Sequence, residues 1–181
     1  DGKIIISGNA LVTSAISDSY SGTIYLKSGS KEDTVLEITG GIVENTDTST
    51  SGRAIYNNAS GDIKISNGIV DSAGGTGIFV GDGKIVISSG TPIIRGGGMA
   101  MNKAPDLSGY ANVRIFGSTT STIDTTAVEI TKEDIDTDAE VKTYKYLKFE
   151  PVSLSSACDI TEVITPVEAN IHGTDITATV S

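Results

Sequence analysis

The chain has 181 residues, of which 38% are hydrophobic, and its 23 acidic and 13 basic residues give a formal net charge of -10. A field of that sign repels nucleic acid and anionic membrane surfaces, so neither is an expected partner. Its single cysteine, Cys158, allows no intrachain disulfide and no thiolate metal cluster. No stretch has the length and apolarity of a membrane span, so we expect no membrane insertion within this chain.

Two dissimilar strand-like motifs alternate along the chain. The first motif alternates Ile or Leu with other residues, usually before a glycine, and occurs at Ile4–Gly8, Leu36–Val43, Ile63–Val70, Ile85–Gly90 and Val113–Gly117. The second motif places an aromatic residue after Ile and occurs at Gly22–Leu26, Arg53–Asn57, Gly77–Val80 and, weakly, Met99–Met101. Their fixed order is typical of stacked solenoid coils, because an antiparallel sandwich or barrel would show equal strands separated by hairpin turns.

The spacing of the first motif predicts the size of a coil. Its copies at Leu36, Ile63, Ile85 and Val113 are separated by steps of 27, 22 and 28 residues. A coil of about 22 residues accommodates three short strands and three turns, and longer steps reflect turn insertions. The expected insertions are rich in polar residues, Gly and Pro: Lys27–Asp33, Asp47–Ser51 and Ala104–Gly109. We therefore predict an all-β fold, a right-handed parallel β-helix over residues 1–152.

Strand alternation predicts which side chains fill the solenoid, because successive residues of a strand face opposite sides. Three interior ladders are expected: Leu36, Ile63, Ile85 and Val113; Ile38, Ile65, Ile87 and Ile115; Ile24, Ile55, Ile78 and Met99. Glycines follow these strands at Gly41, Gly68 and Gly90, where a corner needs a residue that tolerates positive φ.

The outward row of the first motif contains no paired carboxylates. This row is expected to consist of Ile5, Glu37, Lys64, Val86 and Arg114. β-helical lyases and polysaccharide hydrolases need clustered charged side chains on one sheet. Glu37 and Lys64 are instead expected to form a cross-strand ion pair. We therefore predict no catalytic residues and no enzyme activity, and we expect no cofactor.

The outward row of the second motif is aromatic. If the isoleucines of this motif face inward, Tyr25, Tyr56 and Phe79 face outward on three successive coils. Rings about 5 Å apart on a flat sheet suit stacking against sugar rings, with Asn58 as a hydrogen-bond partner. The alternative is that these rings stack only with one another or are covered by a loop or by the C-terminal segment. This row is the candidate carbohydrate-binding site.

Other polar groups are expected to be structural. The only histidine, His172, supports neither a histidine metal site nor a Ser-His-Asp arrangement. The acidic run Glu129–Glu140 lacks the spacing of a calcium-binding loop, so we expect a solvated loop and no metal site. Arg95 is expected to be a solvated turn residue, and Gly81–Gly83 and Gly96–Gly98 follow no phosphate-binding pattern.

Beyond the repeats, the chain changes character. The alternating stretch Tyr144–Glu150 predicts a terminal strand that caps the open end of the solenoid. In residues 153–181, strands are expected at Asp159–Ile164 and Thr174–Val180. Two strands cannot bury a core alone, so this segment either packs on the helix or begins an immunoglobulin-like module.

Four short stretches resemble the repeats of large β-helix surface proteins of Firmicutes and other gut-type bacteria: Ala54–Asn58, Ile65–Val70, Ala100–Pro105 and Tyr144–Pro151. Asp159–Val180 likewise resembles the opening of the small β-sandwich repeats that follow in such chains. The resemblance implies an extracellular, multidomain protein tethered to the cell envelope.

From this resemblance we expect a non-catalytic surface module for adhesion, carbohydrate binding or rigid display. Its expected partners are a glycan or a host or cell-surface protein. We expect a monomer within a longer chain, with any signal peptide or wall anchor outside these residues. The alternative is a polysaccharide lyase or glycoside hydrolase of the β-helix type.

Overall fold

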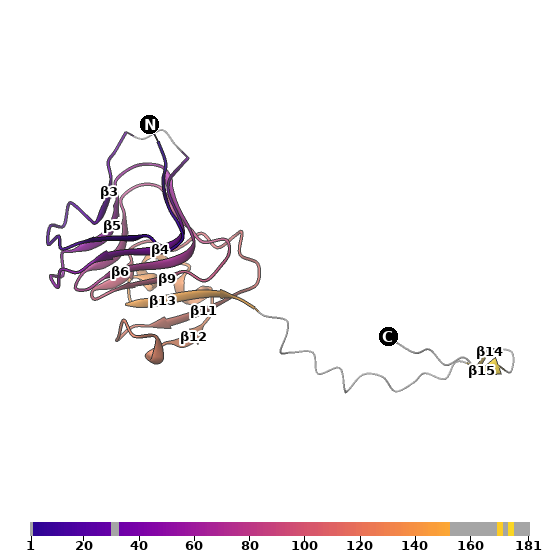
Figure 1. The fold of residues 1–181 in the computed structure, drawn as a ribbon. Coiled ribbons are helices and arrows are strands. Elements are labelled where there is room, and N and C mark those ends of the chain that lie inside the picture. The colour runs from indigo at the N-terminus through magenta and orange to yellow at the C-terminus, as the bar shows by residue number, and fades with distance from the viewer. Residues whose placement is uncertain (1, 30–32, 153–169, 172–173, 176–181) are drawn as a thin grey trace.

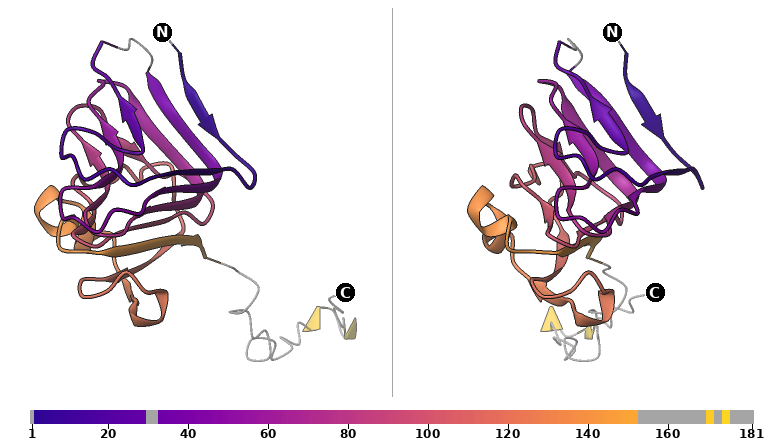
Figure 2. Two further views of the ribbon diagram at one scale, coloured as in Figure 1. Left: turned by 60° about the vertical axis from the view of Figure 1, so that its left-hand side comes forward. Right: turned by 90° about the vertical axis from the view of Figure 1, so that its left-hand side faces the viewer.

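The computed structural model describes residues 2–29, 33–152, 170–171 and 174–175. It is predominantly β, with parallel coils stacked into a β-solenoid of about 3 turns, which confirms the predicted fold class. Figure 1 shows the N terminus at one end of the stack, with β11 (Val113–Ser118) and β12 (Val128–Ile130) at the other. Figure 2 shows the strands of successive coils lying side by side.

Three strand faces enclose the core. The first face comprises β1 (Ile4–Ile6), the beginnings of β4 (Thr34–Asn45) and β6 (Asp62–Ser72), and β8 (Ile85–Val86). The second face comprises β2 (Leu11–Ser14), the ends of β4 and β6, and β9 (Ile93–Gly96). The third face comprises β3 (Ile24–Leu26), β5 (Arg53–Asn57), β7 (Thr76–Val80) and β10 (Met99–Met101).

Glycines form the corner between the first and second faces, as predicted. Gly41, Gly68 and Gly90 have φ angles of 81°, 91° and 76°. Residues other than glycine adopt this left-handed backbone only at a cost, so the corner favours glycine in each coil. The long strands β4 and β6 pass this corner with shifts in their pairing register.

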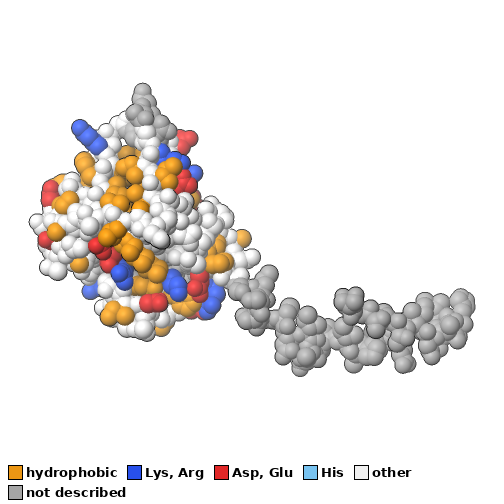
Figure 3. Space-filling view, in the orientation of Figure 1, with side chains coloured by type: hydrophobic (Ala, Val, Ile, Leu, Met, Phe, Trp, Pro, Cys, Tyr) orange, Lys and Arg blue, Asp and Glu red, His pale blue; other side chains and the backbone are white. Residues whose placement is uncertain are grey.

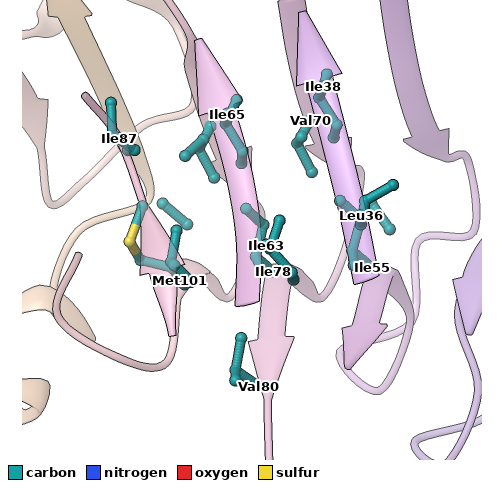
Figure 4. Close-up of a cluster of buried hydrophobic side chains, with 14 of the residues drawn as sticks. Leu36, Ile38, Ile55, Ile63, Ile65, Val70, Ile78, Val80, Ile87 and Met101 are labelled. Carbon is teal, nitrogen blue, oxygen red and sulfur yellow. The ribbon is translucent and has the colours of Figure 1, made fainter. Parts of the chain in front are cut away.

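The interior ladders form largely as expected. Leu36, Ile63 and Ile85 pair in register along the first face and are fully buried. Figure 4 shows how buried side chains from neighbouring coils make a continuous core. On the third face the ladder ends differently. Met101 pairs with Ile78 and is fully buried, whereas the predicted member, Met99, pairs with Thr76.

The prediction that Val113 forms the fourth rung of the first face is wrong. Val113 was expected next to Ile85, but Val113 pairs with Pro151 in an antiparallel sheet, and Ile115 pairs with Phe149. The rung beside β8 is formed instead by Asp106, which makes a parallel bridge to Val86. The expected turn insertion Ala104–Gly109 therefore contributes a rung of its own.

β13 (Tyr146–Pro151) closes the parallel stack, which agrees with the predicted capping strand. It pairs antiparallel with β9 on one side and with β11 on the other. Its inward residues Leu147 and Phe149 are fully buried in the core. The antiparallel strand β13 thus covers the edge of β9, which would otherwise be free to pair with a strand of another molecule.

The hydroxyl of Tyr146 donates a hydrogen bond of 2.7 Å to Asp124 Oδ1, at the start of the 3-10 turn Asp124–Thr126. Burial, reinforced by this bond to the carboxylate, raises the pKa of Tyr146 well above its ordinary value. Because the folded protein holds the Tyr146 proton more tightly than the unfolded chain does, the free energy of unfolding is highest below about pH 10, the ordinary pKa of tyrosine. As the pH rises from there toward the pKa of the folded protein, Tyr146 ionises in the unfolded chain only, and the free energy of unfolding falls.

We therefore expect the free energy of unfolding to fall between about pH 9.5 and pH 11, and the Tyr146→Phe variant to show a shallower fall. Urea unfolding across this range measures both slopes. Tyr110 and Tyr144, whose pKa values burial also raises, remain in the variant and leave a residual slope. Identical slopes in the two proteins would contradict the role given to Tyr146.

The chain between β11 and β13 contains β12, the 3-10 turn Glu133–Ile135 and the short helix α1 (Asp138–Val141). In the C-terminal segment, β14 (Asn170–Ile171) pairs antiparallel with β15 (Thr174–Asp175). The predicted strand Asp159–Ile164, the rest of Thr174–Val180, Cys158 and His172 lie outside the described residues. Among the described residues, no helix has the length and apolar character needed to cross a membrane.

Candidate functional site

The aromatic row predicted on the third face is present. Tyr25 pairs in register with Tyr56, and Tyr56 pairs with Phe79. The rings of Tyr25 and Tyr56 are stacked with centroids 5.3 Å apart, and those of Tyr56 and Phe79 meet edge to face at 5.5 Å. Tyr25 is 43% exposed, and the other two rings are partly buried. The three rings thus form a continuous platform on adjacent strands.

The backbone of the coil places these rings outside. Ile55 and Ile78 precede Tyr56 and Phe79 and point into the core, so the next side chain faces outward. The row ends at Phe79. In β10, Met101 is followed directly by buried Asn102, whose side-chain amide binds the backbone N–H and carbonyl of Val80.

Arg53 covers part of the platform, although no sequence motif singled it out. Its guanidinium carbon lies 3.7 Å from the ring centroid of Phe79 and 4.5 Å from that of Tyr56. Such cation–π contacts hold a guanidinium flat against an aromatic face. The sequence feature that could have indicated this contact is that Arg53 begins the strand that carries Tyr56. The rings of Tyr56 and Phe79 are therefore partly covered by an arginine, which is a different cover from the loop or C-terminal segment of the expected alternative.

Another exposed aromatic residue lies in the connection that leads to the first strand of this platform. Tyr20, in the connection between β2 and β3, is 77% exposed, and its backbone N–H binds Asp18 Oδ1 at 2.9 Å. Burial lowers the pKa of Arg53, while Tyr56, Asp18 and Tyr20 oppose that shift. Thr23, in the same connection, donates its backbone N–H to the carbonyl of Arg53 at 3.2 Å, so the end of this connection lies beside the strand that carries Arg53 and Tyr56. No repeated motif marks Tyr20, so the sequence pattern missed it.

Asn58 lies at the end of the strand that carries Tyr56. Its backbone N–H donates to the carbonyl of Leu26 at 2.8 Å, which fixes the turn to the preceding coil. Its neighbour Asn57 is fully buried, donates to the carbonyl of Gly61 at 2.9 Å and accepts from the backbone N–H of Ala59. Asn58 is partly exposed.

We define the platform as the rings of Tyr25, Tyr56 and Phe79; Arg53 lies over two of these rings, and Asn58 follows the strand that carries Tyr56.

The first face carries a shallow polar groove. It is lined by Glu37, Lys64, Ile65, Ser66, Ser88 and Ser89. Glu37 and Lys64 are neighbours in register, but the ion pair of Glu37 is with Lys3, at 2.6 Å. The hydrogen bond and charge of Lys3 lower the pKa of Glu37, which favours its ionised form.

The other arginines are engaged in ion pairs. Arg95 was expected to be a solvated turn residue, but it belongs to β9 and pairs with Asp71 at 2.9 Å. Arg114 was expected in the outward row of the first face, but it lies on β11. There it pairs with Glu129 at 2.9 Å and Glu150 at 3.5 Å.

The acidic run Glu129–Glu140 is exposed at its carboxylates, whereas Ile135 is buried and anchors it to the core. Within the part of the chain that the structure describes, no group of three or more metal-ligating side chains comes together.

The second face presents an apolar row that no sequence motif indicated. Leu11, Ile42, Ile69 and Ile93 are paired in register across four coils, and Leu11 is 60% exposed. Figure 3 shows hydrophobic side chains gathered over the stacked strands β4, β6 and β9. The row was missed because these residues follow the corner glycines and were not separated from the first-face motif.

Comparison of the chain with protein-family models, with curated proteins and with solved structures finds no match.

Proposed function

We propose that this chain is a non-catalytic, extracellular carbohydrate-binding module of a larger bacterial surface protein. The observation that carries the proposal is the platform of three aromatic rings on adjacent strands, with the exposed Tyr20 in the connection that leads to β3. Sugars present C–H faces that stack on aromatic rings, and a rigid sheet holds those rings without a large ordering cost on binding. Adhesion to a glycan-bearing cell surface follows from the same chemistry.

Tyr25 and Tyr20 are the most exposed of these aromatic rings and are therefore the ones proposed to contact a sugar. Arg53 covers part of Tyr56 and Phe79, so these two rings support the platform more than they face solvent. Partly exposed Asn58 supplies an amide for a sugar hydroxyl at one end of the row. A shallow, open surface of this kind favours binding along an extended glycan over enclosure of a small molecule.

Replacing Tyr20 and Tyr25 together with alanine is expected to abolish detectable binding on a glycan array. Removal of each stacking ring weakens binding by about 1 kcal/mol, and two such decrements are enough to eliminate a weak interaction. Because both side chains are exposed, the melting temperature should change little. Leu11→Ala is the matched control, since it removes an exposed apolar residue from the second face.

If the double variant binds the same glycans as the unaltered protein, the platform is not the binding site. If no glycan is bound by either protein, the carbohydrate-binding proposal fails. Rigid display of other domains would then be the remaining form of the surface-module proposal.

The alternative of a polysaccharide lyase or hydrolase directs attention to the polar groove on the first face. Glu37 and Lys64 are the charged side chains that line it, and Glu37 is held by Lys3. Incubation with uronic-acid polymers tests this alternative. Release of unsaturated or shortened products, and its loss in a Glu37→Gln variant, would favour the enzyme over the binding module.

A further inference from the structure

We propose that the platform selects glycans that carry a carboxylated sugar, and that Arg53 binds the carboxylate. This inference rests on the proposed carbohydrate-binding function and names its ligand class. The ring of the acidic sugar would lie against Tyr25, next to the part of the platform that Arg53 covers, with its carboxylate directed toward the guanidinium. The planar guanidinium matches a carboxylate with two parallel hydrogen bonds.

Arg53 differs from the other two arginines of the chain in its charge partners. Arg95 is paired with Asp71, and Arg114 is paired with two glutamates. Among the described residues, Arg53 forms no ion pair: the rings of Tyr56 and Phe79 hold it, and the carboxylate of Asp18 acts on it only from beyond ion-pair distance. A permanently charged guanidinium without a carboxylate partner is therefore available to an anionic ligand.

The hydrogen bonding of Arg53 supports the same inference. Its Nη1 is shielded from solvent and has no hydrogen-bond partner among the described residues. Because Nη1 is closed to solvent, a carboxylate would bind the rest of the guanidinium, over which the positive charge is delocalised. The side chain as a whole is only partly buried, so it can be approached from solvent. The rings of Tyr56 and Phe79 keep the guanidinium in place before any ligand arrives.

The net charge limits how many acidic groups the ligand carries. At -10, the whole protein repels a polyanion at long range. At about 0.15 M salt this repulsion is screened beyond roughly 8 Å, so a single carboxylate still interacts with Arg53 at contact distance. We therefore expect an otherwise neutral glycan with one acidic sugar to bind more tightly than a highly charged polymer such as polygalacturonate.

Two singly charged probes and their neutral forms test the inference: 3′-sialyllactose, an aldobiouronic acid in which glucuronic acid is joined to xylose, and the carboxyl methyl ester of each. Titration calorimetry or ligand-observed NMR at about 0.15 M salt gives the affinities. At least one acid should bind about tenfold more tightly than its ester, because esterification removes the charge-assisted hydrogen bonds.

The Arg53→Gln variant should lose that preference. Its affinity for the acid should fall by about tenfold, to the level of the ester, while its affinity for the ester stays within about twofold. Arg53→Lys, which keeps the charge without the planar fork, should give an intermediate value. Arg114→Gln is the matched control: it removes a second arginine that lies over an aromatic ring, Phe116, but one already paired with glutamates.

The outcomes separate this inference from the proposed function. If neutral glycans bind and no acid binds more tightly than its ester, carboxylate selection is wrong while carbohydrate binding stands. If Arg53→Gln weakens acid and ester equally, Arg53 only supports the rings, and the inference is again overturned. If none of the probes and no glycan on an array binds, both the inference and the proposed function fall.

Discussion

Replacing Gly90 with alanine is expected to lower the free energy of unfolding by about 2–5 kcal/mol. Gly90 has a φ of 76°, a left-handed conformation that costs an alanine about 1–2 kcal/mol. In addition, a Cβ built at this position overlaps the carbonyl oxygen of Ser66 in the preceding coil. Relief of that overlap requires the two coils to move apart at the corner, which adds an overpacking cost of about 1–3 kcal/mol.

Gly8 provides a matched control at the same corner. Its φ is 62°, but a Cβ added there meets no atom within 4 Å. Gly8→Ala should therefore cost only the backbone strain, about 1–2 kcal/mol. Urea unfolding of both variants measures the difference. Equal losses would show that stacking of the coils at the corner does not constrain Gly90.

Replacing Phe149 with alanine is expected to cost about 3–5 kcal/mol. Phe149 is fully buried on β13, faces the core and pairs across the sheet with Ile115. β13 lies between β9 and β11, so a cavity beneath it loosens the strand that covers the end of the parallel stack. Exposure of the β9 edge should then make the variant more prone to aggregate.

Phe116→Ala is the corresponding control. Phe116 lies on the neighbouring strand β11 but faces outward beneath Arg114 and Lys148. Its loss removes cation–π contacts and should cost about 1 kcal/mol without aggregation. Thermal unfolding and light scattering distinguish the two variants. Similar losses of stability in both would mean that β13 does not seal the core.

The coil architecture could be predicted because it depends on local patterns that repeat. Alternation within each strand showed that Ile63 and Lys64 face opposite sides, and recurrence of the motif placed Ile63 between Leu36 and Ile85. The corner glycines could be predicted for the same reason, because a positive φ is a property of one residue. Because the same local pattern recurs in each coil, it also predicted which residues of neighbouring coils pair with one another.

That reasoning was wrong where the repetition ended. Val113–Gly117 has the same alternation as the earlier strands, but its neighbour is antiparallel β13. Alternation shows which face of a strand is buried and does not show which strand lies beside it. The rung at Asp106 was missed because a single bridge leaves almost no hydrophobic pattern.

In the candidate site, too, part of the arrangement could be predicted from the repeats and part could not. The sequence by itself determined that Tyr25, Tyr56 and Phe79 share one outward row, because strand geometry fixes the direction of each side chain. Only the tertiary structure decided that Arg53 lies over two of these rings and that the connection containing Tyr20 ends beside Arg53. Long side chains and loops are placed by contacts between coils, which depend on three-dimensional packing and leave no periodic signal in the chain.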